Sequence, residues 1–508
     1  MPRPSEGDPM KRLSGTDALF LSMETPAWHQ HVGGLTILEP GDRQVTFEDL
    51  VRTIEERLPA APKFMWKIKE MPFGLDRPAW IDDPDFDVRN HIRRIAVPTP
   101  GGPKETAEVA GMILSTQLDR NRPLWEMWFV EGVIGGRVAL IMKYHHCLMD
   151  GMAGASLATL LMDLEPNPTE VLVPIPPEDE RTAGAEPSNL ELLARSALEA
   201  ARRPARLGSY LFGGAQKIAG AASEALRNDE SRAILRAPET PFNAPIGPRR
   251  ALAFTSVSMD DLRKLKTHHD VKINDLVLTL VSGALRKYLD DQGILPEASL
   301  STGVPVSMRA EGDTTHDNKI STMFLSLNTD IDDPIERLKA IANSAQSAKA
   351  MQKAMSARQI QSIGEVASPL ILSTAIRAVF RAGLMSRLPA RVNTLVSNVP
   401  GPPIPIYSCG AQISGIFPSS VIVDGMGVNC TVISYMDRLD FGFHVDPDLV
   451  PDPWLISEGV PAAMAELLEA SGLGAPTPVK DPFGTEVGGP APRPANGKAS
   501  KPKVPAEA

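Results

Sequence analysis

Cysteine is scarce in this chain, and long uncharged apolar runs are missing. Only three cysteines occur in 508 residues, Cys147, Cys409 and Cys430, too few and too scattered for a disulfide framework or a metal cage. The longest apolar-looking stretch, 363–388, carries Glu365 and three arginines, so no segment suits a bilayer-spanning helix. The first residues lack the apolar core of a secretion signal. We therefore expect a cytoplasmic protein whose membrane contact, if any, is peripheral.

Positively charged residues are also fewer than negatively charged ones. Lysine and arginine number 52 against 62 aspartate and glutamate, which gives a formal net charge of −10. This balance argues against a nucleic-acid partner. The chain is too long for one ordinary core, so two domains with extensions are expected.

Alternating strand and helix patterns predict a mixed α/β domain over residues 13–165. The elements expected there are a strand at 32–38, a helix at 46–58, and a hairpin of 125–130 with 137–144 joined through Gly135-Gly136. A linker of proline-rich and helical segments follows at 166–248. The second mixed domain, 249–473, is expected to hold a strand at 252–258, an amphipathic helix at 274–289 and a hairpin at 427–445. The tail, 474–508, has few apolar residues and is expected to be disordered.

The most informative segment is the run from His145 to Gly151 (HHCLMDG), which follows a buried strand-like stretch and precedes a helix-like one. An imidazole titrates near neutral pH and can take a proton from a hydroxyl as its oxygen attacks a carbonyl. Adjacent histidines at a turn point in different directions, and His146 is the better candidate for the base. Asp150 is a good N-cap that can also pair with an arginine. A structural histidine pair beside a capping aspartate explains these seven residues equally well.

Other interpretations of the turn are weaker. Neighbouring histidines rarely bind one ion and the His-Glu-x-x-His spacing is absent, so no metal site is predicted. Cys147 has no obvious base beside it and is interpreted as a packing residue. A second pair, in His268-His269-Asp270, lacks the glycine and is expected in a solvated loop.

His-His-x-x-x-Asp-Gly is the pattern of the coenzyme A-dependent acyltransferase superfamily. Further elements are Leu13 to Phe20 (LSGTDALF), Pro123 to Glu126 (PLWE), Asn274-Asp275, and Ser397 to Pro402 (SNVPGP). Together they resemble the bacterial wax ester synthase/diacylglycerol acyltransferase family over roughly residues 13–473. The resemblance implies two chloramphenicol acetyltransferase-like mixed-sheet domains facing across a central tunnel, with the histidine turn midway along it.

The resemblance also implies the chemistry. His146 would deprotonate the hydroxyl of a diacylglycerol or long-chain alcohol, which attacks the thioester of an acyl-coenzyme A. His145 and Asp150 would shape the loop, and Gly151 would permit the turn. Asn274 would cap its helix or hydrogen-bond the developing oxyanion. Independently of the resemblance, Arg309 is a candidate partner for Asp150, with a solvated arginine as the alternative.

The resemblance implies no cofactor beyond acyl-coenzyme A as co-substrate, and it assigns no coenzyme A-binding residues. It implies peripheral association with the inner face of the membrane or with lipid inclusions. Stretches 189–226 and 356–388 combine arginines with apolar residues, as interfacial helices or as helices packed on the domains. Asp440-Phe441-Gly442 is interpreted as hairpin structure. Two rival functions are a carrier-protein-dependent condensation-type acyltransferase and a non-catalytic lipid-binding scaffold.

Overall fold

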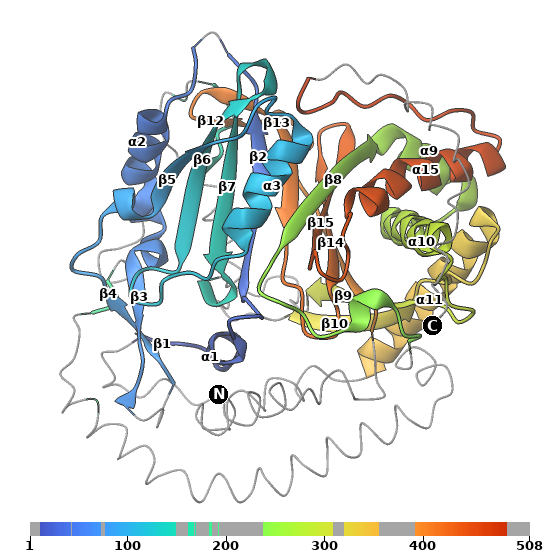
Figure 1. Cartoon of the computed structure of the whole chain (residues 1–508), viewed down its shortest axis with the longest axis horizontal. Helices are drawn as coiled ribbons and strands as arrows, with labels where there is room; N and C mark the ends of the chain where they lie inside the picture. The colour runs from blue at the N-terminus through green and yellow to red at the C-terminus, as the bar shows by residue number, and fades with distance from the viewer. Residues whose placement is uncertain are drawn as a thin grey trace, which may run out of the picture.

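The computed structural model describes residues 11–41, 43–72, 77–148, 161–166, 168, 182–184, 192, 237–307, 320–354 and 392–484. Two six-stranded sheets dominate these residues, and Figure 1 shows them side by side with helices packed around them. Each sheet contains both parallel and antiparallel strand pairs. The predicted architecture of two mixed α/β sheets is therefore confirmed.

The first sheet has the strand order β12-β13-β2-β7-β6-β5. These strands are β12 (Tyr407–Ser408), β13 (Ala411–Ser419), β2 (His31–Leu38), β7 (Arg137–His145), β6 (Trp125–Val133) and β5 (Ile92–Ala96). Neighbours are antiparallel except for β5 and β6, which run parallel. The predicted hairpin is formed by β6 and β7, and both Gly135 and Gly136 between them have positive φ, which glycine adopts at little cost.

Three α-helices and a small sheet complete the part of this half that the structure describes. The helices are α1 (Gly15–Met23), α2 (Phe47–Arg57) and α3 (Pro103–Leu114), and the small sheet has the order β1 (Lys11–Arg12), β4 (Ala79–Asp82), β3 (Trp66–Lys69). α2 begins where the sequence predicts because Thr46 and Asp49 form a capping box. Its apolar face, Leu50, Val51 and Ile54, is buried in the core of this half.

The second sheet has the order β10-β9-β11-β14-β15-β8. Its strands are β10 (Ile320–Ser326), β9 (Ser301–Ser307), β11 (Thr394–Val399), β14 (Val428–Tyr435), β15 (Arg438–Val445) and β8 (Ala251–Ser258); its helices are α9 (Met259–His269), α10 (Ile273–Asp291), α11 (Pro334–Ala354) and α15 (Trp454–Ala470). The predicted helix and hairpin correspond to α10 and to β14–β15. α10 is buried continuously from Asp275 to Leu285, and Gly459 lets α15 approach it closely, because a Cβ there would press on the backbone of Ala284.

The second half contributes β12 and β13 to the first sheet, and a buried carboxylate also links the two halves. β13 lies beyond β11 in the chain, yet it pairs with β2 of the first sheet. Asp440, on β15 of the second sheet, is fully buried and accepts hydrogen bonds from the Ile416 backbone N–H of β13 at 3.0 Å and from the Ser256 hydroxyl at 2.6 Å. Gly442 follows on β15, where a Cβ would overlap the carbonyl oxygen of Pro418. Asp440-Phe441-Gly442 is hairpin structure, as predicted, and it also joins the two sheets.

The expectation of disorder from Gly474 onward is wrong for residues 474–484. Phe483 is buried and stacks on Phe254, with ring centroids 5.6 Å apart. The Ser414 hydroxyl donates to the carbonyl of Pro482 at 2.9 Å. One aromatic anchor outweighs a proline-rich composition here, because it buries a large apolar surface. The rest of the predicted tail, 485–508, lies outside the described residues.

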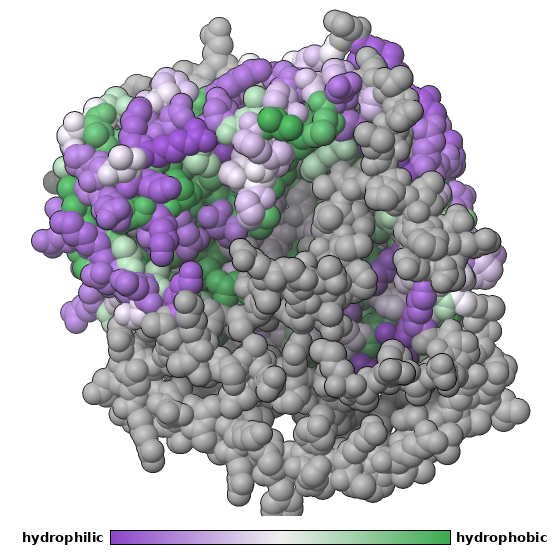
Figure 2. All heavy atoms as spheres, turned by 180° about the vertical axis from the view of Figure 1, so that it is seen from behind, coloured by the Kyte–Doolittle hydropathy of each residue, from purple (hydrophilic) through white to green (hydrophobic). Residues whose placement is uncertain are grey.

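Where Figure 2 colours the surface, hydrophilic and hydrophobic residues are interspersed. Large exposed apolar side chains come from separate elements, as Met112, Ile294 and Leu455 do. Within the described ranges, no helix is both long enough and apolar enough to cross a bilayer.

Candidate active site

The histidine turn follows β7 without interruption. His145 is the last residue of β7, and His146 opens a short 3-10 turn, His146–Leu148. β7 is paired with β2 on one side and β6 on the other, so its end is held rigidly. The His145 N–H donates to the Leu124 carbonyl at 2.9 Å, and the His146 N–H donates to the Gln30 carbonyl at 2.7 Å. Both histidines are therefore fixed at the backbone.

The Pro-Leu-Trp element supports this turn from the adjacent strand. Leu124 supplies the carbonyl that holds His145. Trp125 is buried, its indole N–H donates to the Phe64 carbonyl at 2.7 Å, and its ring stacks on His91. Because Trp125 is enclosed in the core, its part here is to hold β6 beside β7.

His145 is buried with a defined hydrogen-bond pattern. Its Nδ1 accepts from the backbone N–H of Cys147 at 3.1 Å, so the proton of the neutral ring belongs on Nε2. That nitrogen faces Oε2 of Glu24 at 3.9 Å. Burial, reinforced by the nearby Arg120 cation, holds the pKa of His145 well below its ordinary value. His145 is therefore a neutral side chain that stabilises the turn through its hydrogen bond with the backbone of Cys147.

His146 retains some contact with solvent although it lies deep among protein atoms. Burial lowers its pKa from 6.5 to about 4, so the ring is neutral at physiological pH. Phe20 of α1 stacks on it, with ring centroids 4.1 Å apart and planes inclined by 25°. Its Nδ1 is buried and has no hydrogen-bond partner within the described part of the chain. A neutral imidazole that keeps some contact with solvent is able to accept a proton from a hydroxyl.

Cys147 is enclosed completely, and burial raises the pKa of its thiol. A protonated, inaccessible thiol is neither a nucleophile nor a metal ligand, in agreement with the packing role predicted for it. The second histidine pair is not in a loop, which corrects the sequence-based expectation. His268 and His269 end α9, Asp270 caps it in the left-handed conformation, and Nε2 of His269 lies 2.7 Å from the Ser471 hydroxyl. Histidine at a helix C-terminus suits the helix dipole.

Asp150, Gly151 and Arg309 lie outside the described residues, so the roles assigned to them stay predictions. The same holds for all of 356–388 and for all of 189–226 except Leu192. Within the described ranges, no three histidine, cysteine, aspartate or glutamate side chains are grouped as metal ligands.

Asn274 is the second residue of α10 and does not cap it. The capping carboxylate is that of Asp275, which accepts from the Lys272 backbone N–H at 2.9 Å. The capping role expected of Asn274 therefore belongs to its neighbour. Asn274 instead lines a cavity of about 800 Å³ whose described walls also carry Lys272, Lys339 and Lys349. The described lining residues of this cavity all belong to the second half, and the role of Asn274 toward the developing oxyanion stays a prediction.

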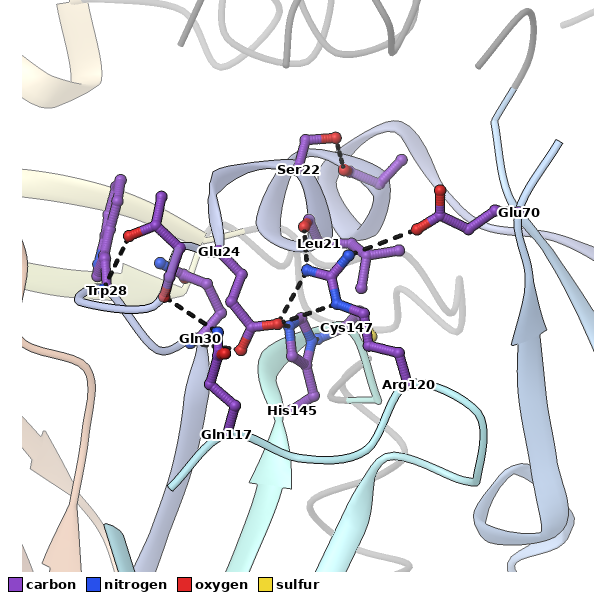
Figure 3. A network of polar contacts seen from close by, with 12 residues as sticks. Leu21, Ser22, Glu24, Trp28, Gln30, Glu70, Gln117, Arg120, His145 and Cys147 are labelled. Carbon is purple, nitrogen blue, oxygen red and sulfur yellow. Dashed lines mark hydrogen bonds and ion pairs between the residues drawn. The ribbon is translucent and has the colours of Figure 1, made fainter. Parts of the chain in front are cut away.

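Sequence reasoning assigned no role to several side chains around the turn. Phe20 and Glu24 come from α1 and its C-cap, and Arg120 comes from the loop before β6. Figure 3 shows Glu24 and Arg120 converging with His145. Phe20 ends the LSGTDALF element noted in the sequence, and that element was the available signal for an aromatic contact. Glu24 and Arg120 are 96 positions apart, and no local pattern pairs them.

Two family models cover most of the chain. The wax ester synthase/diacylglycerol acyltransferase catalytic domain matches residues 13–277, and the C-terminal domain of the same family matches residues 316–468. A Mycobacterium tuberculosis protein named as a diacylglycerol O-acyltransferase is 37% identical over 91% of this chain and 91% of its own. A second mycobacterial protein of that name is 32% identical over 91% of this chain and 100% of its own.

Solved structures agree with these matches. A wax ester synthase/diacylglycerol acyltransferase from Marinobacter aquaeolei shares 26% identity and a TM-score of 0.66, covering 91% of this chain and all of that one. The first condensation domain of the calcium-dependent antibiotic synthetase reaches a TM-score of 0.50 at 13% identity, over 92% of this chain and 97% of that one, and shows likeness of fold alone. From its two matched domains and its full-length relatives, the chain belongs to the wax ester synthase/diacylglycerol acyltransferase family.

Proposed function

We propose that this protein transfers a long-chain acyl group from acyl-coenzyme A to the hydroxyl of a diacylglycerol or a long-chain alcohol, with His146 as general base. The observation that carries the proposal is the state of His146. It is a neutral ring at the rigid end of β7 that retains some contact with solvent. Family membership supplies the substrate class, and the relatives named as diacylglycerol O-acyltransferases support the acceptor.

The proposed reaction needs a single imidazole. The neutral ring of His146 accepts the proton of the acceptor hydroxyl as that oxygen bonds to the thioester carbonyl carbon. The carbon–sulfur bond then breaks, and the imidazolium returns the proton to the coenzyme A thiolate. The products are an ester and free coenzyme A, and the base is regenerated. His145 takes no part in proton transfer, because its Nδ1 is occupied by the Cys147 N–H.

The lipid substrates indicate where the protein works. Each methylene group buried from water contributes about 0.8 kcal/mol, so long acyl chains partition into membranes and lipid inclusions. We propose that the protein docks on such surfaces peripherally, through 189–226 or 356–388. Flotation with phospholipid vesicles, comparing the whole chain with variants whose arginines in either stretch are replaced by glutamine, tests this. Unchanged flotation of a variant would eliminate that stretch.

Turnover by the purified protein tests the main proposal. It is supplied with palmitoyl-coenzyme A and either diacylglycerol or hexadecanol, while thiol release and lipid products are followed. The expected result is stoichiometric formation of free thiol and ester with at least one acceptor. Lipid binding without turnover would favour a non-catalytic scaffold, and turnover that requires an acylated carrier protein would favour the condensation-type rival.

A further inference from the structure

Glu24 is an acid buried at the edge of the histidine turn. Its side chain is 3% exposed, and it forms the C-cap of α1. Nε and Nη2 of Arg120 donate to its Oε2 at 3.1 and 2.9 Å, and the Gln30 backbone N–H donates to its Oε1 at 3.4 Å. Arg120 is itself anchored, because Nη2 also donates to the Leu21 carbonyl at 2.8 Å (Figure 3). The carboxylate is thus held in place by two other chain segments, the loop that carries Arg120 and the residues before β2 that include Gln30.

The same carboxylate faces the first histidine of the turn. Oε2 lies 3.9 Å from Nε2 of His145, the nitrogen on which the neutral ring carries its proton. This separation exceeds a hydrogen bond, yet a buried anion still favours the tautomer whose N–H points toward it. Glu24 therefore selects the tautomer that leaves Nδ1 free to accept from the Cys147 N–H. That bond fixes the turn around His146.

Glu24 also reaches His146 through the backbone of one residue. The Gln30 N–H is bound by the Glu24 carboxylate, and the Gln30 carbonyl accepts from the His146 N–H at 2.7 Å. The Glu24 carboxylate therefore faces His145, which precedes the proposed base, and also binds Gln30, whose carbonyl holds the backbone of that base. A shift of that acid would move the backbone from which the His146 ring projects.

We propose that Glu24, held by Arg120, is the positioning residue of the proposed active site, setting the tautomer of His145 and the backbone position of His146. This inference rests on the proposed function for its kinetic consequences. It does not make Glu24 a catalytic residue, because no contact joins its carboxylate to the His146 ring among the interactions described. A buried carboxylate paired with an arginine that is 35% exposed is weak evidence of a stabilising role alone, which gives the pair reason to have another role.

Arg120 provides a matched control. Its Nη1 also contacts Glu70 at 3.4 Å, but the Glu70 side chain is 67% exposed. Glu24→Gln and Glu70→Gln therefore remove charge from the two acids of the same arginine, one facing the turn and one facing water. We expect Glu24→Gln to lower kcat by about tenfold to a hundredfold with KM for acyl-coenzyme A unchanged, and Glu70→Gln to change neither. Equal kcat values for Glu24→Gln and the unaltered protein would overturn the proposal.

A double variant separates positioning from support of the fold. Glu24→Gln leaves Arg120 without its buried partner, so its Tm should fall, and adding Arg120→Gln should restore most of the Tm by removing the unpaired charge. The proposal expects kcat to remain low in the double variant, because no carboxylate then faces His145. If kcat recovers together with Tm, the pair supports the fold only and the proposal is wrong.

A spectroscopic measurement keeps this inference distinct from the proposed activity. The ¹⁵N shifts of histidine-labelled protein report the tautomer of His145, identified by the signals that disappear in His145→Asn. The proposal expects the Nε2–H form in the unaltered protein and in Glu70→Gln, and a mixture of tautomers in Glu24→Gln. An unchanged tautomer in Glu24→Gln would overturn it. Absence of turnover in the unaltered protein would instead count against the proposed function and leave this measurement decisive for Glu24.

Discussion

Phe20 lies over the ring of His146, with centroids 4.1 Å apart and an interplanar angle of 25°. α1 therefore reaches the histidine turn twice, through this stacked ring and through Glu24 at its C-terminal end. Ser14 caps the start of the helix by accepting from the Asp17 backbone N–H at 3.1 Å. The orientation of the proposed base depends on a helix formed near the beginning of the matched family domain.

Replacing Phe20 with leucine should lower kcat while KM changes little. The stacked pair contributes about 1 kcal/mol beyond apolar burial, equivalent to about fivefold in kcat if it is lost in the transition state. Steady-state kinetics with palmitoyl-coenzyme A would measure the effect. Phe20→Tyr keeps the aromatic face and should retain the activity. An unaltered kcat in Phe20→Leu would show that the stack does not orient the base.

Activity should persist to an unusually low pH. Burial lowers the pKa of His146 to about 4, so the neutral base is present above that pH and is lost as the pH falls through it. The profile of kcat/KM should accordingly have its acidic midpoint near 4, with circular dichroism at each pH confirming that the chain is folded. A midpoint near the ordinary histidine value of 6.5 would contradict this environment for His146.

Stability should decline with acid because several histidines are buried in the neutral form. Burial, with Arg250 nearby, lowers the pKa of His29 to about 4 and that of His444 to about 3. Below pH 6.5 these histidines bind protons in the unfolded chain but stay neutral in the folded protein. The free energy of unfolding is therefore highest above pH 6.5 and decreases as the pH falls toward the folded-state pKa values. For His29 the loss amounts to about 3 kcal/mol. Urea denaturation above and below pH 6.5 measures it, and equal free energies of unfolding would refute it.

Asp440→Asn should destabilise the junction between the sheets. Asp440 is fully buried, pairs with Arg438 at 3.0 Å, and accepts from the Ile416 N–H, so its replacement leaves a buried guanidinium without its counter-charge. The expected loss is about 3 to 5 kcal/mol. Asp448→Asn is the control, because Asp448 pairs with Arg249 at the exposed surface, where such pairs contribute about 1 kcal/mol or less. Similar urea midpoints for the two variants would contradict a structural role for Asp440.

Local sequence patterns predicted many of the helices and strands, but they did not predict which distant strands pair. The strand at β2, the capped helix α2 and the hairpin β14–β15 follow from periodicity, a capping box and turn residues. The pairing of β13 with β2 joins residues whose positions differ by more than 370, as in Ile413 with Leu38. No periodicity encodes such a partner, since it depends on how two completed sheets meet.

The candidate site shows the same difference between local features, which the sequence predicted, and long-range contacts, which it did not. His145 and His146 were found from the sequence because their chemistry and the buried strand before them are local. The cap of α10 was assigned one residue early, because both Asn274 and Asp275 are good capping residues and only the geometry selects Asp275. Glu24 and Arg120 were missed because their pairing exists only after α1 and the loop before β6 come together.

The role of His146 as general base is tested most sharply by the rate of free-thiol release by His146→Ala with palmitoyl-coenzyme A and the preferred acceptor. General-base catalysis contributes about 10²- to 10⁴-fold, and a side chain with some solvent contact at the end of β7 can be shortened without disturbing the sheet. We expect a folded protein with an unchanged circular dichroism spectrum and a kcat reduced at least a hundredfold. A folded His146→Ala variant that retains the kcat of the unaltered protein would contradict that role.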